Sequence, residues 1–332
     1  MIINRLAYVR DGIELMRKLT FHRLWNYGKI LISYRISLFS KRPVIWSGPF
    51  SLSFETASVC NLRCPECITG AGLTNRNNKL LSREFVSRKT QLHKSHAFYC
   101  NLYFQGEPFL NPDIFDAIKT AVSANYYTVI STNGHFLKED QCYKIIESGL
   151  HRIIISLDGS DKESYQSYRA GGSFEAVIKG IQRLASLKKA KGSPFPYLVI
   201  QFLVNKTNEN QLDQARTLSK KLGADELQFK SMQIYSSKGM SEFLPGKKQF
   251  RRYDSAGRLV KKPSNCFRLW SHMVYTSDGE AVLCCYDKEP NYPLGNKEEN
   301  SMDIWRSERL QSFRKKNLMG TDTPDICGNC GE

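Results

Sequence analysis

Three cysteines within eight residues are the strongest chemical signal in this sequence of 332 residues. Cys60, Cys64 and Cys67 directly follow a β-rich run at 51–58. Because α/β folds place their chemistry on loops at the carboxyl ends of parallel strands, we expect the three thiols at a reactive edge. Three thiolates can hold a four-iron cluster and leave one iron open, as a catalytic metal site requires. A zinc site with a distant fourth ligand is the alternative.

A second group of cysteines lies further along the chain and also has metal-ligand spacing. Its members are Cys266, Cys284, Cys327 and Cys330. A hairpin that turns at Asp278 and Gly279 would bring the first two together. Four thiols can close one iron–sulfur cluster or one structural zinc site. Cys285 is either a spare or an alternate ligand in place of Cys284.

Polar residues recur where the later β-rich runs end. They are Gly106, Glu107 and Pro108 after 98–104, Ser131 and Asn133 at the end of 127–131, Ser156 and Asp158 at the end of 152–157, Arg169 within 168–174, Gln201 on 197–204, and Asn205 at its end. Glycine lets a backbone approach a ligand closely, a carboxylate accepts from an ammonium, and arginine binds a carboxylate bidentately. Each of these positions, called polar stations below, is by itself also typical of an ordinary strand-to-loop turn. The evidence for a ligand site is that they recur at successive strand ends.

Alternating strands and helices must position these residues. Strands are predicted at 51–58, 98–104, 127–131, 152–157, 197–204 and 227–232, and helices at 82–92, 112–123, 138–147, 174–189 and 211–222. Units of this kind in series predict a parallel sheet with right-handed crossovers. Periodicity does not choose between an open doubly wound sheet and a barrel. After residue 235 the alternation stops, which predicts a domain boundary.

Residues 1–48 form a basic amphipathic extension in which arginine and lysine alternate with apolar residues. One or two amphipathic helices are predicted. Their apolar stripe either packs on the main domain, as a helical cap would, or contacts an anionic membrane or a partner. Cys100 and Cys142 stand apart from the other cysteines and are predicted to be inert, buried thiols.

The cysteine triplet, with three and then two intervening residues, resembles the radical S-adenosylmethionine (SAM) superfamily, and so do the recurring polar stations. The resemblance covers about residues 50–332 and implies a partial (β/α)6 TIM-like barrel at 49–235. By this resemblance, Cys60, Cys64 and Cys67 would hold a [4Fe-4S] cluster that binds and reductively cleaves SAM. The 5′-deoxyadenosyl radical that is released abstracts a hydrogen atom from the substrate.

The resemblance also implies roles for the polar stations. Gly106, Glu107 and Pro108 would contact the methionyl amino group, and Arg169 its carboxylate. Contacts to the ribose and carboxylate would come from Ser131, Asn133, Ser156 and Asp158, with Gln201 and Asn205 as weaker ribose candidates. The chain departs from the family at two positions: Gln105 replaces a usual glycine, and Glu66 replaces an aromatic residue that packs near the adenine.

The second cysteine group resembles the auxiliary-cluster modules called SPASM and, in the shorter form, twitch. This resemblance implies a linker and a small iron–sulfur module at 236–332, with Cys266, Cys284, Cys327 and Cys330 as ligands. A full SPASM module would carry a longer run of cysteines for a second auxiliary cluster. We therefore infer the twitch form, with one auxiliary [4Fe-4S] cluster.

The composition bounds the function further. A net charge of +16 favours acidic partners. The sequence contains no run of 18 apolar residues, so a membrane-spanning helix is not predicted. Without a signal-peptide pattern the protein is interpreted as cytoplasmic, with contact to an anionic membrane surface through 1–48 left open. Oxidative modification of a peptide or protein is the first hypothesis, with flavodoxin or ferredoxin as electron donor. Dehydrogenation or rearrangement of a small polar metabolite is the second, and a non-catalytic nucleic-acid-binding protein is a remote third.

Overall fold

The strands of the protein join in a single sheet. The computed structural model describes residues 1–260 and 265–330, so six residues of the expected module at 236–332 lie outside the described part. The parallel strands are β1 (Ser51–Phe54), β2 (Tyr99–Asn101), β3 (Tyr127–Thr132), β4 (Arg152–Ser156), β5 (Tyr197–Val204) and β6 (Glu226–Ser231). All six predicted strands are present, although β1 and β2 are shorter than predicted.

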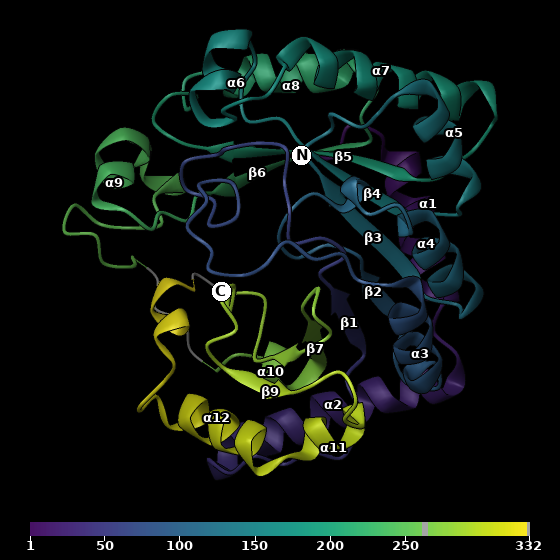
Figure 1. Cartoon of the computed structure of the whole chain (residues 1–332), viewed down its shortest axis with the longest axis vertical. Helices are drawn as coiled ribbons and strands as arrows, with labels where there is room; N and C mark the ends of the chain where they lie inside the picture. The colour runs from purple at the N-terminus through teal and green to yellow at the C-terminus, as the bar shows by residue number, and fades with distance from the viewer. Residues whose placement is uncertain (261–264, 331–332) are drawn as a thin grey trace.

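The order of the strands decides between a barrel and an open sheet. The sheet runs β6-β5-β4-β3-β2-β1-β7-β8-β9, so each crossover steps to the next neighbour in the same direction. Right-handed crossovers that all step one way place every helix on one face, and the sheet curls away from them. Figure 1 shows these helices in an arc outside the strands. The predicted partial (β/α)6 barrel is therefore confirmed.

The outer helices begin at capping residues and bury one face against the strands. Those of the barrel are α3 (Arg83–His93), α4 (Ile114–Ser123), α5 (Glu139–Glu147), α6 (Lys162–Tyr168), α7 (Phe174–Ala190) and α8 (Leu212–Lys221). Ser82 and Ser173 accept from the Phe85 and Ala176 amides and so start α3 and α7. The sequence prediction missed the short helix α6, which precedes Arg169.

The C-terminal part adds a small region beside β1 (Figure 1). Its elements, with the helix that precedes it, are α9 (Ser237–Phe243), α10 (Arg268–Ser271), β7 (His272–Tyr275), β8 (Ala281–Val282), β9 (Pro293–Gly295), α11 (Ser301–Arg306) and α12 (Glu308–Met319). Strand β7 pairs with β1 in parallel, and β7 and β8 form the predicted hairpin around Gly279, whose φ is 84°. The hairpin therefore continues the barrel sheet.

Two helices precede the barrel, α1 (Arg5–Arg17) and α2 (Phe21–Ser40), as predicted for the extension. They attach to the strand starts through polar side chains. Asp11 pairs with Arg152 at the start of β4, and the buried Arg23 donates to the Lys94 and Ala124 carbonyls. Ile30 of α2 is buried in the main core, and Tyr34 and Leu38 pack against that core, so part of the apolar surface of the extension covers the main domain as a helical cap would.

Candidate active site

The cysteine triplet lies on the loop that leaves the carboxyl end of β1. The loop folds back on itself, because the Cys67 amide donates to the Cys64 carbonyl at 3.1 Å. Its other side is held by the Arg63 amide, which donates to the Ala170 carbonyl at 2.8 Å. Cys64 is buried, whereas Cys60 and Cys67 are half-buried. The three thiols thus share one end of the barrel with the segment that carries Arg169.

Glu107 ties the glycine motif to the end of β3. Its carboxylate accepts from the Thr132 hydroxyl at 2.7 Å and from the Asn133 amide at 2.8 Å. A Cβ atom at Gly106, where φ is 66°, would lie 2.3 Å from the Ala57 carbonyl oxygen, so only glycine fits there. Burial raises the pKa of Glu107 to about 7. The motif is therefore locked against the loop that bears the cysteines.

Asn133 is the link from β3 to the cysteine loop itself. Its amide nitrogen lies 3.7 Å from the Cys60 sulfur and 2.8 Å from the Asn61 side-chain oxygen. An amide that donates to sulfur favours the thiolate, which is the form that binds iron. The structure thus brings this predicted residue to the triplet, through a contact to the protein. Thr132, between the two residues named from the sequence, is part of the same network and was not predicted.

Asp158 and Arg169 form a buried ion pair beside the triplet. Arg169 donates through Nε to Asp158 at 2.6 Å, and its Nη1 atom lies 3.8 Å from the Cys64 sulfur. The second Asp158 oxygen accepts from the Leu203 amide at 2.7 Å. Burial raises the pKa of Cys64 to about 11, while the Arg169 charge acts in the opposite direction. The pair therefore places the positive charge of Arg169 beside Cys64, where it favours the thiolate form.

The remaining predicted residues lie at neighbouring strand ends. Ser156 on β4 is in register with Gln201 on β5, and Ser131 is the last residue but one of β3. Pro108 is buried and begins a short 3-10 helix. Asn205 caps a turn, since its side-chain oxygen accepts from the Thr207 amide at 2.8 Å. Direct contacts of all these residues with SAM stay predictions.

Glu66, the departure from the family pattern, has a partner in the fold. Its carboxylate accepts from the Tyr235 amide and the Ser236 hydroxyl, both at 2.6 Å, just before α9. A Cβ atom at Gly239 would lie 2.0 Å from a Glu66 oxygen. An aromatic ring at position 66 would displace this segment. The carboxylate therefore anchors the chain after β6 to the cysteine loop.

The four cysteines of the second group line a single cavity of about 660 Å³. Cys266 precedes α10 and is held by α12, because its amide donates to the Asn317 side chain at 2.8 Å. Cys284 follows the hairpin, and Cys327 and Cys330 belong to the final turn, where the Cys330 amide donates to the Cys327 carbonyl at 3.1 Å. The fold thus gathers the expected ligand set from three separate segments.

Cys285 is not among the residues that line that cavity. The Arg268 guanidinium lies 3.1 Å from its sulfur. The charges of both Cys285 and Cys67 act on Lys288, whose amine donates to the Tyr235 hydroxyl at 2.6 Å. Of the two neighbouring cysteines, only Cys284 lines the four-cysteine cavity. Neither Lys288 nor Tyr235 was predicted, because no motif marks them.

Both donor sets suit iron–sulfur clusters. Cysteine thiolates are the ligands of such clusters, three leaving one iron open and four closing the site. Among the described residues, no group of three histidine, cysteine or acidic side chains is placed to hold a single metal ion. A four-iron cluster is larger than one ion and takes thiols that stand further apart. Cys100 and Cys142 are fully buried elsewhere in the core, as predicted.

Family models match both parts of the chain. Residues 54–214 match the radical SAM superfamily, and residues 266–331 match an iron–sulfur cluster-binding domain, SPASM. Together with the buried network around the triplet, these matches establish the class. The chain belongs to the radical SAM superfamily, is an enzyme of that class, and carries a SPASM-type module. Its cofactors are accordingly SAM and [4Fe-4S] clusters.

Curated relatives match about half of the chain. The mycofactocin maturase MftC of Mycobacterium tuberculosis is 27% identical over 176 residues, which are 53% of this chain and 43% of the maturase. The AdoMet-dependent heme synthase of Methanosarcina barkeri is 28% identical over 182 residues, 54% of this chain and 49% of the synthase. The match thus spans less than half the length of each relative.

Solved structures share the fold over most of the chain. SuiB of Streptococcus suis, bound to S-adenosylmethionine, aligns with a TM-score of 0.63 at 16% identity, over 86% of this chain and 73% of SuiB. BtrN, in complex with AdoMet and 2-DOIA, aligns with a TM-score of 0.53 at 20% identity, over 86% of this chain and 94% of BtrN. The barrel and the module therefore occur together in known proteins.

Proposed function

We propose that this chain cleaves SAM reductively and uses the product to modify a peptide or protein side chain oxidatively. The observation that carries the proposal is the network in which Asn133 and Arg169 reach the sulfurs of the triplet. Support for a peptide comes from the relatives, since MftC is a maturase and SuiB has been solved bound to its precursor peptide SuiA. An acidic flavodoxin or ferredoxin suits the net charge of +16 as electron donor.

The chain's own residues have distinct tasks in this proposal. Cys60, Cys64 and Cys67 would hold the cluster that binds SAM, and the buried Arg169 keeps a cation beside them. When bound to the reduced cluster, SAM supplies a 5′-deoxyadenosyl radical that abstracts a hydrogen atom from the substrate. The four cysteines of the module would hold one auxiliary cluster.

The space between the two cysteine groups is where we place the substrate. Lys288 and Arg268 lie there with Tyr235 and Cys285. Two cations on facing segments favour a substrate that carries a carboxylate or a phosphate. An acidic peptide segment meets this requirement. A small anionic metabolite meets it too and is the second candidate, favoured by the same two cations.

Anaerobic reconstitution tests the proposal. We expect the protein, given iron, sulfide, SAM and dithionite, to form 5′-deoxyadenosine; if none forms, the proposed reaction is wrong. Addition of a boiled extract of the source organism should then stimulate product formation. Stimulation that a prior protease treatment abolishes supports a peptide, whereas stimulation that survives the protease supports the metabolite.

A further inference from the structure

The exposed apolar surface of the protein is concentrated in one segment. Residues 1–48 contain 15 of the 22 large hydrophobic side chains that are exposed in the described part of the chain. Phe39 is 95% exposed, Phe21 78% and Trp25 63%. Scattered exposed hydrophobic residues are ordinary, but a contiguous set marks an interaction surface. The segment therefore has a role beyond packing.

Helix α2 carries apolar residues on its outward side as well as on its inner side. The side that packs on the barrel carries Ile30 together with four polar residues, Arg23, Asn26, Ser33 and Ser37, all buried. Their polar atoms bond to the backbone, as when Asn26 exchanges hydrogen bonds with Gly48 at 3.0 and 3.2 Å. The helix positions on the opposite side carry Phe21, Trp25, Gly28, Ile32, Ile36 and Phe39. An apolar stripe on the outward side of a helix is suited to an apolar environment.

Helix α1 also has an outward apolar stripe. Its inner side carries Asp11, paired with Arg152, and Glu14, which bonds Lys18 at 2.6 Å. Its exposed side carries apolar residues at helical spacing, namely Leu6, Val9, Ile13 and Met16. In both helices the inner side is satisfied by the protein, and the outward apolar stripe is not covered by the described residues.

Charge decides which kind of surface fits. Residues 1–48 include nine lysines and arginines but only two acids, Asp11 and Glu14. Both acids lie on the inner side of α1, so the outward face is basic as well as apolar. Long basic side chains beside an aromatic and aliphatic stripe are typical of helices that lie in the headgroup region of an anionic bilayer. A partner protein would need a matching acidic and apolar groove.

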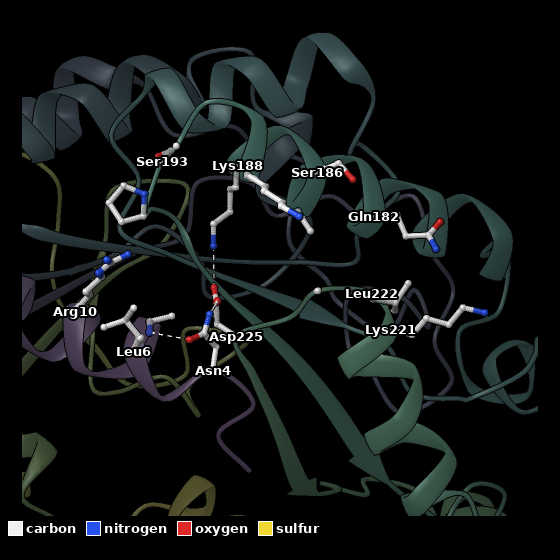
Figure 2. A pocket seen from close by; sticks show the side chains of 16 residues that line it. Asn4, Leu6, Arg10, Gln182, Ser186, Lys188, Ser193, Lys221, Leu222 and Asp225 are labelled. Atoms are coloured by element: carbon white, nitrogen blue, oxygen red, sulfur yellow. Dashed lines mark hydrogen bonds and ion pairs between the residues drawn. The ribbon is translucent and has the colours of Figure 1, made fainter.

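A groove next to α1 adds further basic groups. It has a volume of about 820 Å³ and lies between α1 and the ends of α7 and α8 (Figure 2). Leu6 and Arg10 line it from α1, and Lys189 and Lys221 line it from the other helices. Lys188 at its base is neutralised by Asp225 at 2.8 Å. Arg10, Lys189 and Lys221 thus form a cationic rim beside the apolar stripe.

We propose that α1 and α2 attach the protein to the surface of an anionic lipid bilayer. The apolar stripe enters the headgroup region, and the basic residues, including the cationic rim of the groove, contact lipid phosphates. No helix within the described ranges is suited to cross a bilayer, so attachment would be peripheral. The two helices pack on the starts of the strands, opposite the end that bears the cysteines, so the active site would open away from the membrane.

Vesicle flotation of the reconstituted, full-length protein tests this proposal. We expect binding to phosphatidylcholine vesicles that contain phosphatidylglycerol and much weaker binding to phosphatidylcholine alone. Replacing the aromatic residues together (F21S, W25S and F39S) should reduce binding at least about tenfold. Replacing Arg10 and Arg35 with glutamine should reduce it about tenfold on the anionic vesicles only. The control is L92S with Y143S, which changes exposed apolar residues elsewhere and should leave binding unchanged.

Two results would overturn the proposal. One is wild-type protein that does not float with anionic vesicles, or that floats as well after the aromatic replacements. The other is a dimer of the wild type that the aromatic replacements convert to monomers without any effect of lipid, since a second copy would then cover the stripe. 5′-Deoxyadenosine formation in detergent-free solution should be the same in all variants, so the test is independent of the proposed reaction.

Discussion

The two cysteine groups are assembled in opposite ways. The triplet lies within eight residues of one loop, and three later strand ends supply only the groups around it. The second group takes its four cysteines from segments as far apart as Cys266 and Cys330, which α12 and the hairpin bring to one cavity. A local loop can present three thiols with one position left open. A closed set of four here requires the tertiary fold.

This contrast suggests a division of labour. The triplet depends on its neighbours for charge, through Arg169 and Asn133, and sits where a ligand can reach it. The module depends on its neighbours for position, since Asn317 of α12 holds Cys266 at the four-cysteine cavity. Changes at the triplet should therefore affect chemistry first, whereas changes in the module should affect metal content and structure.

The largest expected effect is that of Cys64→Ala. It removes one of three local ligands, so SAM cleavage should fall to background and about four iron atoms per chain should be lost. Iron analysis and chromatography of 5′-deoxyadenosine measure the two effects. Cys142→Ala removes a buried thiol from the core and is the matched control, with both quantities kept. If C64A still cleaves SAM, the triplet has been assigned the wrong cluster.

Cys284 and Cys285 give the sharpest test of the module. Cys284→Ala should lose the auxiliary iron, about half of the total, while Cys285→Ala should keep it, because only Cys284 lines the four-cysteine cavity. Electron paramagnetic resonance and iron analysis of the two variants show which of the two cysteines is a ligand of the auxiliary cluster. Equal iron loss in both variants would contradict the assignment of Cys284 rather than Cys285 as the ligand.

Glu107 should make the stability of the cluster-free protein depend on pH. Burial raises its pKa from 4.5 to about 7, so between these values the folded protein holds a proton that the unfolded chain has released. Stability is therefore lost as the pH rises through this window, by roughly 3 kcal/mol in total. Urea unfolding from pH 4.5 to 7.5 measures the free energy, and Glu107→Gln should flatten this slope. A slope that is unchanged in the variant would rule out Glu107 as its source.

The smallest effect is expected at Glu66. Glu66→Gln keeps the shape but weakens the hydrogen bonds to Tyr235 and Ser236, at a cost of about 1 kcal/mol in unfolding free energy. Thermal unfolding measures this loss. The affinity for SAM should stay within about twofold, because the carboxylate serves the fold. A large loss of SAM affinity with unchanged stability would instead place Glu66 in the cofactor site.

The amino-acid sequence determined the parts of this protein that depend on neighbours along the chain. Turns, caps and loop spacing are short-range properties. Local patterns therefore predict the spacing of the triplet, the succession of strands along the chain, the hairpin at Gly279 and the helical extension. Glu107, Asn133 and Asp158 could be named for the same reason, since each lies on a loop within a few residues of the end of a strand.

Only the tertiary structure decided which side of each element meets which partner. It selected the barrel through the strand order, placed Cys284 rather than Cys285 in the cavity, and gave Glu66 a structural partner from beyond β6. It also turned the apolar stripes of α1 and α2 outward, although an amphipathic pattern alone fits either orientation. The physical reason is the same each time. The periodicity of the sequence determines that the two faces of a helix or strand differ in polarity, but contacts between distant parts of the chain determine which face is buried.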